Sequence, residues 1–148
     1  MKLLLLLCCI NRFMFWTDWG NTPKIERSTL NGTHRVTIVT SNLHWPMGID
    51  LDRRNQMVFW VDASLSRVES VDYHGNNRKL LYQRALGLHH FSGVTFFSPY
   101  LYVTELYSNT IFRLNATYLN QGSITQRVHL PSKLNGLVAY DSSRQPPG

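Results

Sequence analysis

The side chains of this 148-residue chain that are best suited to chemistry are histidines and carboxylates. His89 and His90 form its one adjacent histidine pair, and imidazole nitrogens are common metal ligands. Neighbouring residues of a strand point to opposite faces, however, so the two rings chelate a single ion poorly. The histidine spacing therefore predicts no metal site.

Three carboxylates recur at nearly constant spacing. Asp18 and Asp62 are 44 residues apart, and Glu105 follows after 43 more. Such a series could converge on a metal ion. Each residue instead ends an apolar strand pattern and precedes a turn, where a carboxylate can accept backbone N–H groups that no strand ladder reaches. We therefore favour a structural role for all three.

Signatures of catalysis are absent from the sequence. It has no nucleophile elbow, phosphate-binding loop, zinc-ligand spacing or dinucleotide fingerprint. The only two cysteines, Cys8 and Cys9, are adjacent and cannot link distant parts of the chain. The sequence predicts no enzyme activity, cofactor or metal.

Composition excludes several further classes. The chain is 43% hydrophobic and 12% aromatic, which is not the composition of a disordered protein. Its formal charge of +6 is scattered, with Arg53-Arg54 and Arg78-Lys79 as the only basic pairs, so no nucleic-acid partner is expected. The longest apolar run, residues 3–10, is too short for a membrane-spanning helix, and no direct membrane insertion is expected.

A repeat of about 43 residues organises these side chains. The strand pattern at 14–18 recurs at 58–62 and, less faithfully, at 101–105. The residues that carry the repeated motif are Phe15, Trp16, Thr17, Asp18, Phe59, Trp60, Asp62, Tyr102 and Glu105. A glycine also leads an apolar strand in each later unit, at Gly48, Gly93 and Gly136. A period of 40–45 residues with four short strands is typical of a β-propeller blade.

The middle unit shows this pattern most clearly. Short runs rich in β-branched and aromatic residues lie at 47–51, 57–61, 67–71 and 78–82, separated by turn residues. No segment has sustained helical periodicity. We predict an all-β chain of four-stranded antiparallel blades, each covered on both faces by its neighbours.

The repeated residues resemble a known family. Phe15-Trp16-Thr17-Asp18-Trp19-Gly20, Trp45-Pro46 before Gly48-Ile49, and Asn76-Asn77-Arg78-Lys79 are similar, in order, to the YWTD (class B) repeats of the low-density lipoprotein receptor family. The resemblance covers about residues 13–145. It implies a partial six-bladed propeller with about three blades, at about 13–39, 47–82 and 91–129, and a closing strand at 136–140.

The two ends of the chain are interpreted with the same family in mind. Residues 1–12 have two interpretations: a short signal peptide, or a truncated leader that replaces an inner strand. Residues 146–148 look like the exit towards an EGF-like module.

The resemblance also implies a function. We expect a non-catalytic extracellular module, from the ectodomain of an endocytic or signalling receptor, that binds protein ligands or the receptor's own acidic calcium-binding modules and contributes to acid-dependent ligand release. Trp45, at a blade entry, is either an exposed aromatic anchor or packing between blades. His89 matches a position where the family carries a pH-sensing histidine.

Two N-glycosylation sequons fit a chain in the secretory pathway, at Asn31 and Asn115. Two alternatives to the binding module stay open: a structural spacer, and a lactonase-like propeller enzyme with a metal in its central channel. For the enzyme, Asp50 is one ligand candidate, but Thr95 and Val138 occupy its position in the other units.

Overall fold

The computed structural model describes residues 3–8, 12–84, 90–116, 124–132, 134 and 137–139. All of its regular structure is β-strand. No helix with the length and hydropathy needed to span a bilayer is found in this described part.

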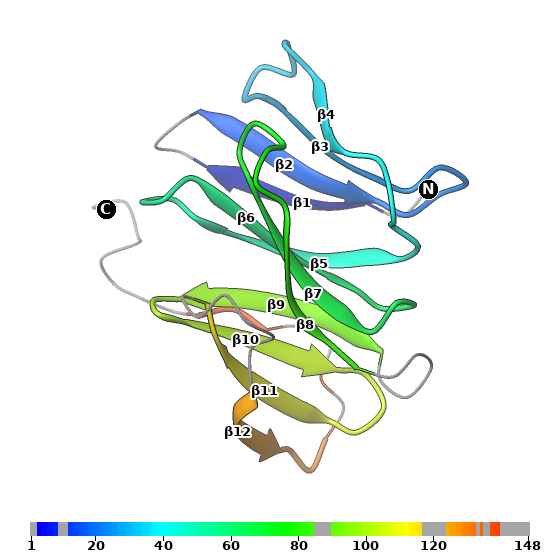
Figure 1. Cartoon of the computed structure of the whole chain (residues 1–148), viewed down its shortest axis with the longest axis vertical. Coiled ribbons are helices and arrows are strands. Elements are labelled where there is room, and N and C mark those ends of the chain that lie inside the picture. The colour runs from blue at the N-terminus through cyan, green and yellow to red at the C-terminus, as the bar shows by residue number, and fades with distance from the viewer. Residues whose placement is uncertain are drawn as a thin grey trace.

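The strands form three four-stranded antiparallel sheets, each in sequence order, which we call blades 1 to 3. Blade 1 contains β1 (Leu3–Cys8), β2 (Phe13–Asp18), β3 (Lys24–Thr29) and β4 (Val36–Val39). Blade 2 contains β5 (Pro46–Asp52), β6 (Met57–Asp62), β7 (Arg67–Asp72) and β8 (Lys79–Gln83). Blade 3 contains β9 (Phe91–Phe97), β10 (Tyr100–Glu105), β11 (Thr110–Asn115) and β12 (Ile124–His129). The blades follow one another down the long axis of Figure 1. The predicted all-β fold of four-stranded antiparallel blades is confirmed.

Side chains along the second strand of a blade point alternately to its two faces, and the motif of that strand is apolar on both. Trp60 is completely buried in a core between blades 1 and 2, together with Phe15 and Ile25. Its neighbours Phe59 and Val61 point the other way, into a core between blades 2 and 3. Since both faces of blade 2 are covered, apolar side chains are stabilised on both.

Gly48, the first of the repeated glycines, lies where two neighbouring blades approach closely. A Cβ built on Gly48 would lie 2.7 Å from the Cα of Gly93 and 2.7 Å from the nitrogen of Val94. Only a residue without a side chain allows β5 and β9 to approach so closely. A Cβ built on Gly93 would instead meet the hydroxyl oxygen of Thr104, in its own blade, at 2.8 Å.

An ion pair between an arginine and a buried glutamate is repeated in blades 1 and 2. Arg35 contacts the carboxylate of Glu26 at 2.6 Å, and Arg78 contacts that of Glu69 at 2.7 Å. Burial of Glu26 opposes its ionisation, but the bonds from Arg35 outweigh burial and lower its pKa. Arg78 also lies over the ring of Trp60 at 5.3 Å.

The two ends of the repeat region need separate comment. Residues 3–8 form β1, which pairs with β2 in the register Leu3↔Asp18 to Cys8↔Phe13; this is the place that the truncated-leader interpretation gave them. Contrary to the expected closing strand, 137–139 form no strand, and the N–H of Ala139 bonds to the hydroxyl of Thr95, a side chain, over 3.1 Å. Gly136, Tyr140 and residues 146–148 lie outside the described residues.

Candidate protein-binding face

The carboxylate that ends the second strand organises the loops at one end of each blade. Asp62 is completely buried, and its two oxygens accept the backbone N–H groups of His44 (2.7 Å), Trp45 (3.1 Å) and Leu65 (3.0 Å). One side chain thus fixes both the entry to blade 2 and the turn after β6.

Glu105 has the same role in blade 3. It accepts the N–H groups of His90 (3.2 Å), Tyr107 (3.1 Å) and Ser108 (2.6 Å). Burial opposes ionisation of Glu105, but these hydrogen bonds outweigh it and lower its pKa.

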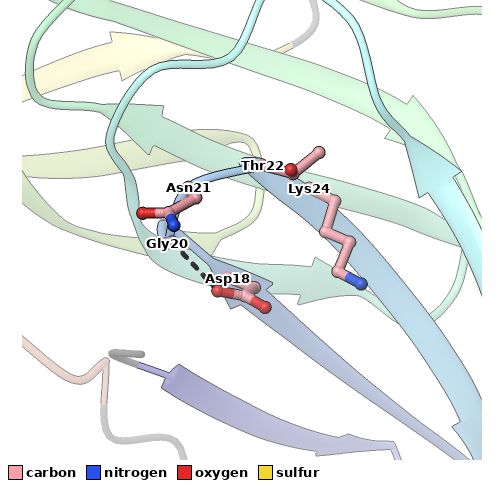
Figure 2. Close-up of a pocket in the computed structure, with 5 residues that line it drawn as sticks. All are labelled: Asp18, Gly20, Asn21, Thr22 and Lys24. Atoms are coloured by element: carbon pink, nitrogen blue, oxygen red, sulfur yellow. Dashed lines mark hydrogen bonds between the residues drawn. The ribbon is translucent and has the colours of Figure 1, made fainter.

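Asp18, in blade 1, accepts one N–H group, that of Gly20 at 3.1 Å. Figure 2 shows this bond at the edge of an open hollow of about 350 Å³ in the β2–β3 turn. The residues that line the hollow are Asp18, Gly20, Asn21, Thr22 and Lys24. In the described part of the chain no three His, Cys, Asp or Glu side chains come together as a metal site would require.

Trp45 lies at the entry to blade 2 and is 43% exposed. Its ring is 6.2 Å from that of Trp19 and stacks at 6.2 Å on His44. The Nδ1 atom of His44 is in turn 2.6 Å from the hydroxyl of Ser64. Trp45 is therefore an exposed aromatic residue on a loop held by Asp62, and its contact with Trp19 of blade 1 keeps the packing interpretation open beside the anchor one.

His89 lies outside the described residues, but its neighbour His90 is described. The carbonyl of His90 accepts the N–H of Leu106 at 2.9 Å, just as the carbonyl of Trp45 accepts that of Ala63 at 2.9 Å. His90 is thus the counterpart of Trp45 in the next blade. Its ring packs edge-on against Tyr107, with centroids 4.9 Å apart.

We call the surface that these side chains form the aromatic face; its residues are Trp19, His44, Trp45, His90 and Tyr107. All five lie where the second strand of a blade ends and the first strand begins, so they share one end of the blades. Tyr107 is 73% exposed, the largest value among the aromatic side chains that the structure describes.

Sequence reasoning missed four of these five residues. The signal that could have found His90 is the 45-residue step from Gly48 to Gly93, which also leads from Trp45 to His90. Trp19 and Tyr107 carry no repeat signal, because the positions that follow Asp18 and Glu105 differ between blades.

Asp50, the candidate channel ligand, has another use. Its Oδ2 accepts the hydroxyl of Thr95 at 2.9 Å and the N–H of Phe96 at 2.7 Å. The carboxylate therefore joins the inner strands of blades 2 and 3. Val138, the third residue of that series, is 86% exposed.

The two sequons lie at the opposite end of the blades. Asn31 is exposed in the β3–β4 turn, whereas Asn115 is the last residue of β11 and pairs with Tyr100 of β10. Thr117, which completes the second sequon, lies outside the described residues.

Comparison with known proteins shows which proteins this chain is similar to. The low-density lipoprotein receptor repeat class B model matches residues 12–52. The chain is 39% identical over 92 residues to the vitellogenin receptor Yl of Drosophila melanogaster, covering 62% of this chain and 4% of that one. It is 28% identical over 127 residues to the human low-density lipoprotein receptor-related protein 5-like protein, covering 86% and 48%.

Solved structures agree with the sequence relatives. A chain in the crystal structure of a nidogen/laminin complex matches with a TM-score of 0.80 and 27% identity, over 90% of this chain and 50% of that one. A luciferin-regenerating enzyme matches with a TM-score of 0.69 but only 14% identity, over 91% and 48%, and shows the fold alone. The chain spans about half or less of each of these relatives. Residues 12–52 match the class B (YWTD) repeat of the low-density lipoprotein receptor, and the chain as a whole is similar to these receptor relatives in sequence and to the nidogen/laminin chain in fold.

Proposed function

We propose that the chain is a non-catalytic, extracellular protein-binding module and that the aromatic face is its contact surface. The observation that carries the proposal is the exposure of Trp45 and Tyr107 on loops fixed by buried carboxylates. Exposed aromatic residues on a preorganised backbone are typical of binding hot spots, because little entropy is lost when a partner covers them.

The charge of the chain favours an acidic partner. Its net charge is +6, and the acidic groups that end β6 and β10, Asp62 and Glu105, are buried with their oxygens turned to backbone N–H groups. They add little negative charge to the surface around the aromatic rings. Acidic calcium-loaded receptor modules, or protein ligands of similar charge, are therefore the partners we propose.

Acid-dependent ligand release is the finer part of the proposal. Histidine is the side chain whose charge changes between neutral and endosomal pH, and the two described blade entries carry His44 and His90. His44 faces Ser64 and the ring of Trp45, with Asp62 bonded to its backbone; His90 faces Tyr107, with Glu105 bonded to its backbone. An added positive charge at a blade entry would strengthen contact with an acidic module, which would then displace a bound ligand. His89 stays in the proposal as the family's counterpart.

The test is affinity for recombinant, calcium-loaded acidic receptor modules at pH 7.4 and 5.5. We expect Trp45→Ala to weaken binding at least about tenfold, the effect of losing a hot-spot side chain. Leu30→Ala is the matched control, because Leu30 is also 43% exposed but lies in the β3–β4 turn. His90→Ala and His89→Ala should reduce the gain in affinity at pH 5.5.

Two outcomes would favour other functions. Equal effects of Trp45→Ala and Leu30→Ala would remove the aromatic face from binding and favour the structural spacer. Ester hydrolysis that depends on a divalent metal and is lost in Asp50→Asn would favour the lactonase-like enzyme.

A further inference from the structure

We infer that Asn31 is a site of N-linked glycosylation, occupied in preference to Asn115, and that its glycan projects from the end of the blades opposite the aromatic face. The first half of this inference requires passage through the secretory pathway but no binding activity. The second half, on the position of the glycan, uses the face defined above.

The turn around Asn31 is closed by backbone hydrogen bonds and is exposed to solvent. The N–H of Thr29 bonds to the carbonyl of Thr33 at 3.0 Å, and the N–H of Gly32 bonds to the carbonyl of Thr29 at 2.9 Å. Gly32 has φ +82°, and a Cβ built on it would have no atom within 4 Å. Asn31 therefore stands at the exposed tip of a rigid hairpin with room around it.

The amide of Asn31 is arranged so that its nitrogen is free. Its Oδ1 accepts the hydroxyl of Thr29 at 2.5 Å, the hydroxyl of Thr33 at 2.8 Å and the N–H of Thr33 at 3.3 Å. Among the described residues no partner contacts Nδ2. The hydroxyl of Thr33 thus bonds to the amide oxygen, which leaves the nitrogen that must carry the sugar without a partner among the described residues.

The reaction is a group transfer with a lipid-pyrophosphate-linked oligosaccharide as donor. The Nδ2 atom forms a bond to the anomeric carbon of the first sugar and loses one proton. The bond from that carbon to the pyrophosphate oxygen breaks, and the lipid pyrophosphate leaves with the electron pair. No oxidant or reductant takes part.

Asn115 offers a less suitable setting. It is half-buried, lies inside the antiparallel register of β10 and β11, and precedes Ala116, whose N–H bonds to the carbonyl of Pro99 at 2.9 Å. A glycan there must leave from the edge of a paired strand rather than from a hairpin tip. We therefore expect lower occupancy at Asn115 than at Asn31.

The position of Asn31 keeps its glycan away from the aromatic face. The six residues of β3 separate the β2–β3 turn, which carries Trp19, from the β3–β4 turn. At about 3.3 Å per residue, this separation is about 20 Å. Leu30 bonds to the carbonyl of Arg12 at 3.1 Å, which ties the Asn31 turn to the start of β2.

The experiment expresses the full chain behind a heterologous secretion signal in cultured animal cells and measures site occupancy in medium and cell extract together. Glycosidase release in heavy-oxygen water converts each glycosylated Asn to a labelled Asp, which peptide mass spectrometry counts. We expect labelling at Asn31 in most molecules and lower labelling at Asn115. Thr33→Ala should abolish labelling at Asn31, whereas Thr33→Ser, which keeps the sequon, should retain it.

Unlabelled Asn31 in wild-type material would overturn the inference, as would higher occupancy at Asn115. Because occupancy is counted without any binding partner, such a failure is separate from failure of the proposed function. Enzymatic removal of the glycan should also leave affinity for calcium-loaded acidic modules unchanged; a change of more than about threefold would refute the position assigned to it.

Discussion

Replacing Asp62 tests whether a buried carboxylate holds the binding loops in place. Asp62→Ala removes the acceptor of three backbone N–H groups, at 2.7, 3.1 and 3.0 Å. A hydrogen bond to a charged group contributes roughly 1.5–3 kcal/mol, and a buried N–H left without a partner costs a similar amount. His44 and Leu65 lie near enough to solvent for water to replace part of that loss, and the buried charge itself is costly.

These opposing effects leave a net cost of about 3 kcal/mol for Asp62→Ala. In urea unfolding followed by tryptophan fluorescence, the midpoint should fall by about 1–3 M, given a slope of roughly 1–3 kcal/mol per molar. Asp62→Asn, which retains one carbonyl oxygen, should lie between Asp62→Ala and the parent.

The repeat supplies the matched control. Asp18 occupies the same position in blade 1 but, among the described residues, accepts only the N–H of the exposed Gly20. Asp18→Ala should cost less than about 1 kcal/mol. Equal midpoints for Asp18→Ala and Asp62→Ala, or a parent-like Asp62→Asn, would refute the idea that the number of accepted N–H groups sets the stability.

Three further predictions follow from the cores and the acidic groups. Trp60→Ala should destabilise the chain by roughly 3–5 kcal/mol, because it empties the core between blades 1 and 2; unchanged yield and unfolding midpoint would contradict this. Gly48→Ala should cost about 1–3 kcal/mol, because the new Cβ meets the backbone of Gly93 at 2.7 Å. Gly20→Ala should cost almost nothing, because its Cβ meets only a side-chain oxygen at 3.3 Å. Equal unfolding midpoints for the two variants would count against the close approach of β5 and β9. The pKa of Glu105 is lowered in the folded chain, so its stabilisation is complete above the ordinary glutamate pKa and is lost as pH falls through the lower folded value. In Glu105→Gln, the free energy of unfolding should therefore fall less steeply with pH below about pH 4 than in the parent.

The blades could be predicted from sequence because every mark of the repeat has a physical cause. Trp60 and Phe59 are large because both faces of blade 2 are covered. Gly48 lacks a side chain because the inner strands β5 and β9 touch there, and Gly93 because a Cβ would meet the hydroxyl oxygen of Thr104. Asp62 and Glu105 recur because each blade has the same loops to join.

The aromatic face could be predicted only in part. Trp45 stands out as a large residue before an inner strand, but the partners that expose and orient it are set by tertiary contacts: Asp62 lies 17 positions away and Trp19 26. His90 takes the position of Trp45 at the next blade entry, 45 residues further along the chain. A repeat period averaged to 43 residues does not point to it. The use of Asp50 to join blades 2 and 3 also needs coordinates, because its partners Thr95 and Phe96 lie in the next repeat.

Binding by the aromatic face is the central claim, and a glycan placed on that face tests it most directly. Pro23→Ser completes a sequon at Asn21, an exposed residue of the hollow beside Trp19 (Figure 2). Affinity for calcium-loaded acidic receptor modules should fall at least tenfold in the secreted variant and return when the glycan is removed enzymatically. Unchanged affinity with Asn21 fully occupied, or absence of binding by the parent chain, would contradict the account.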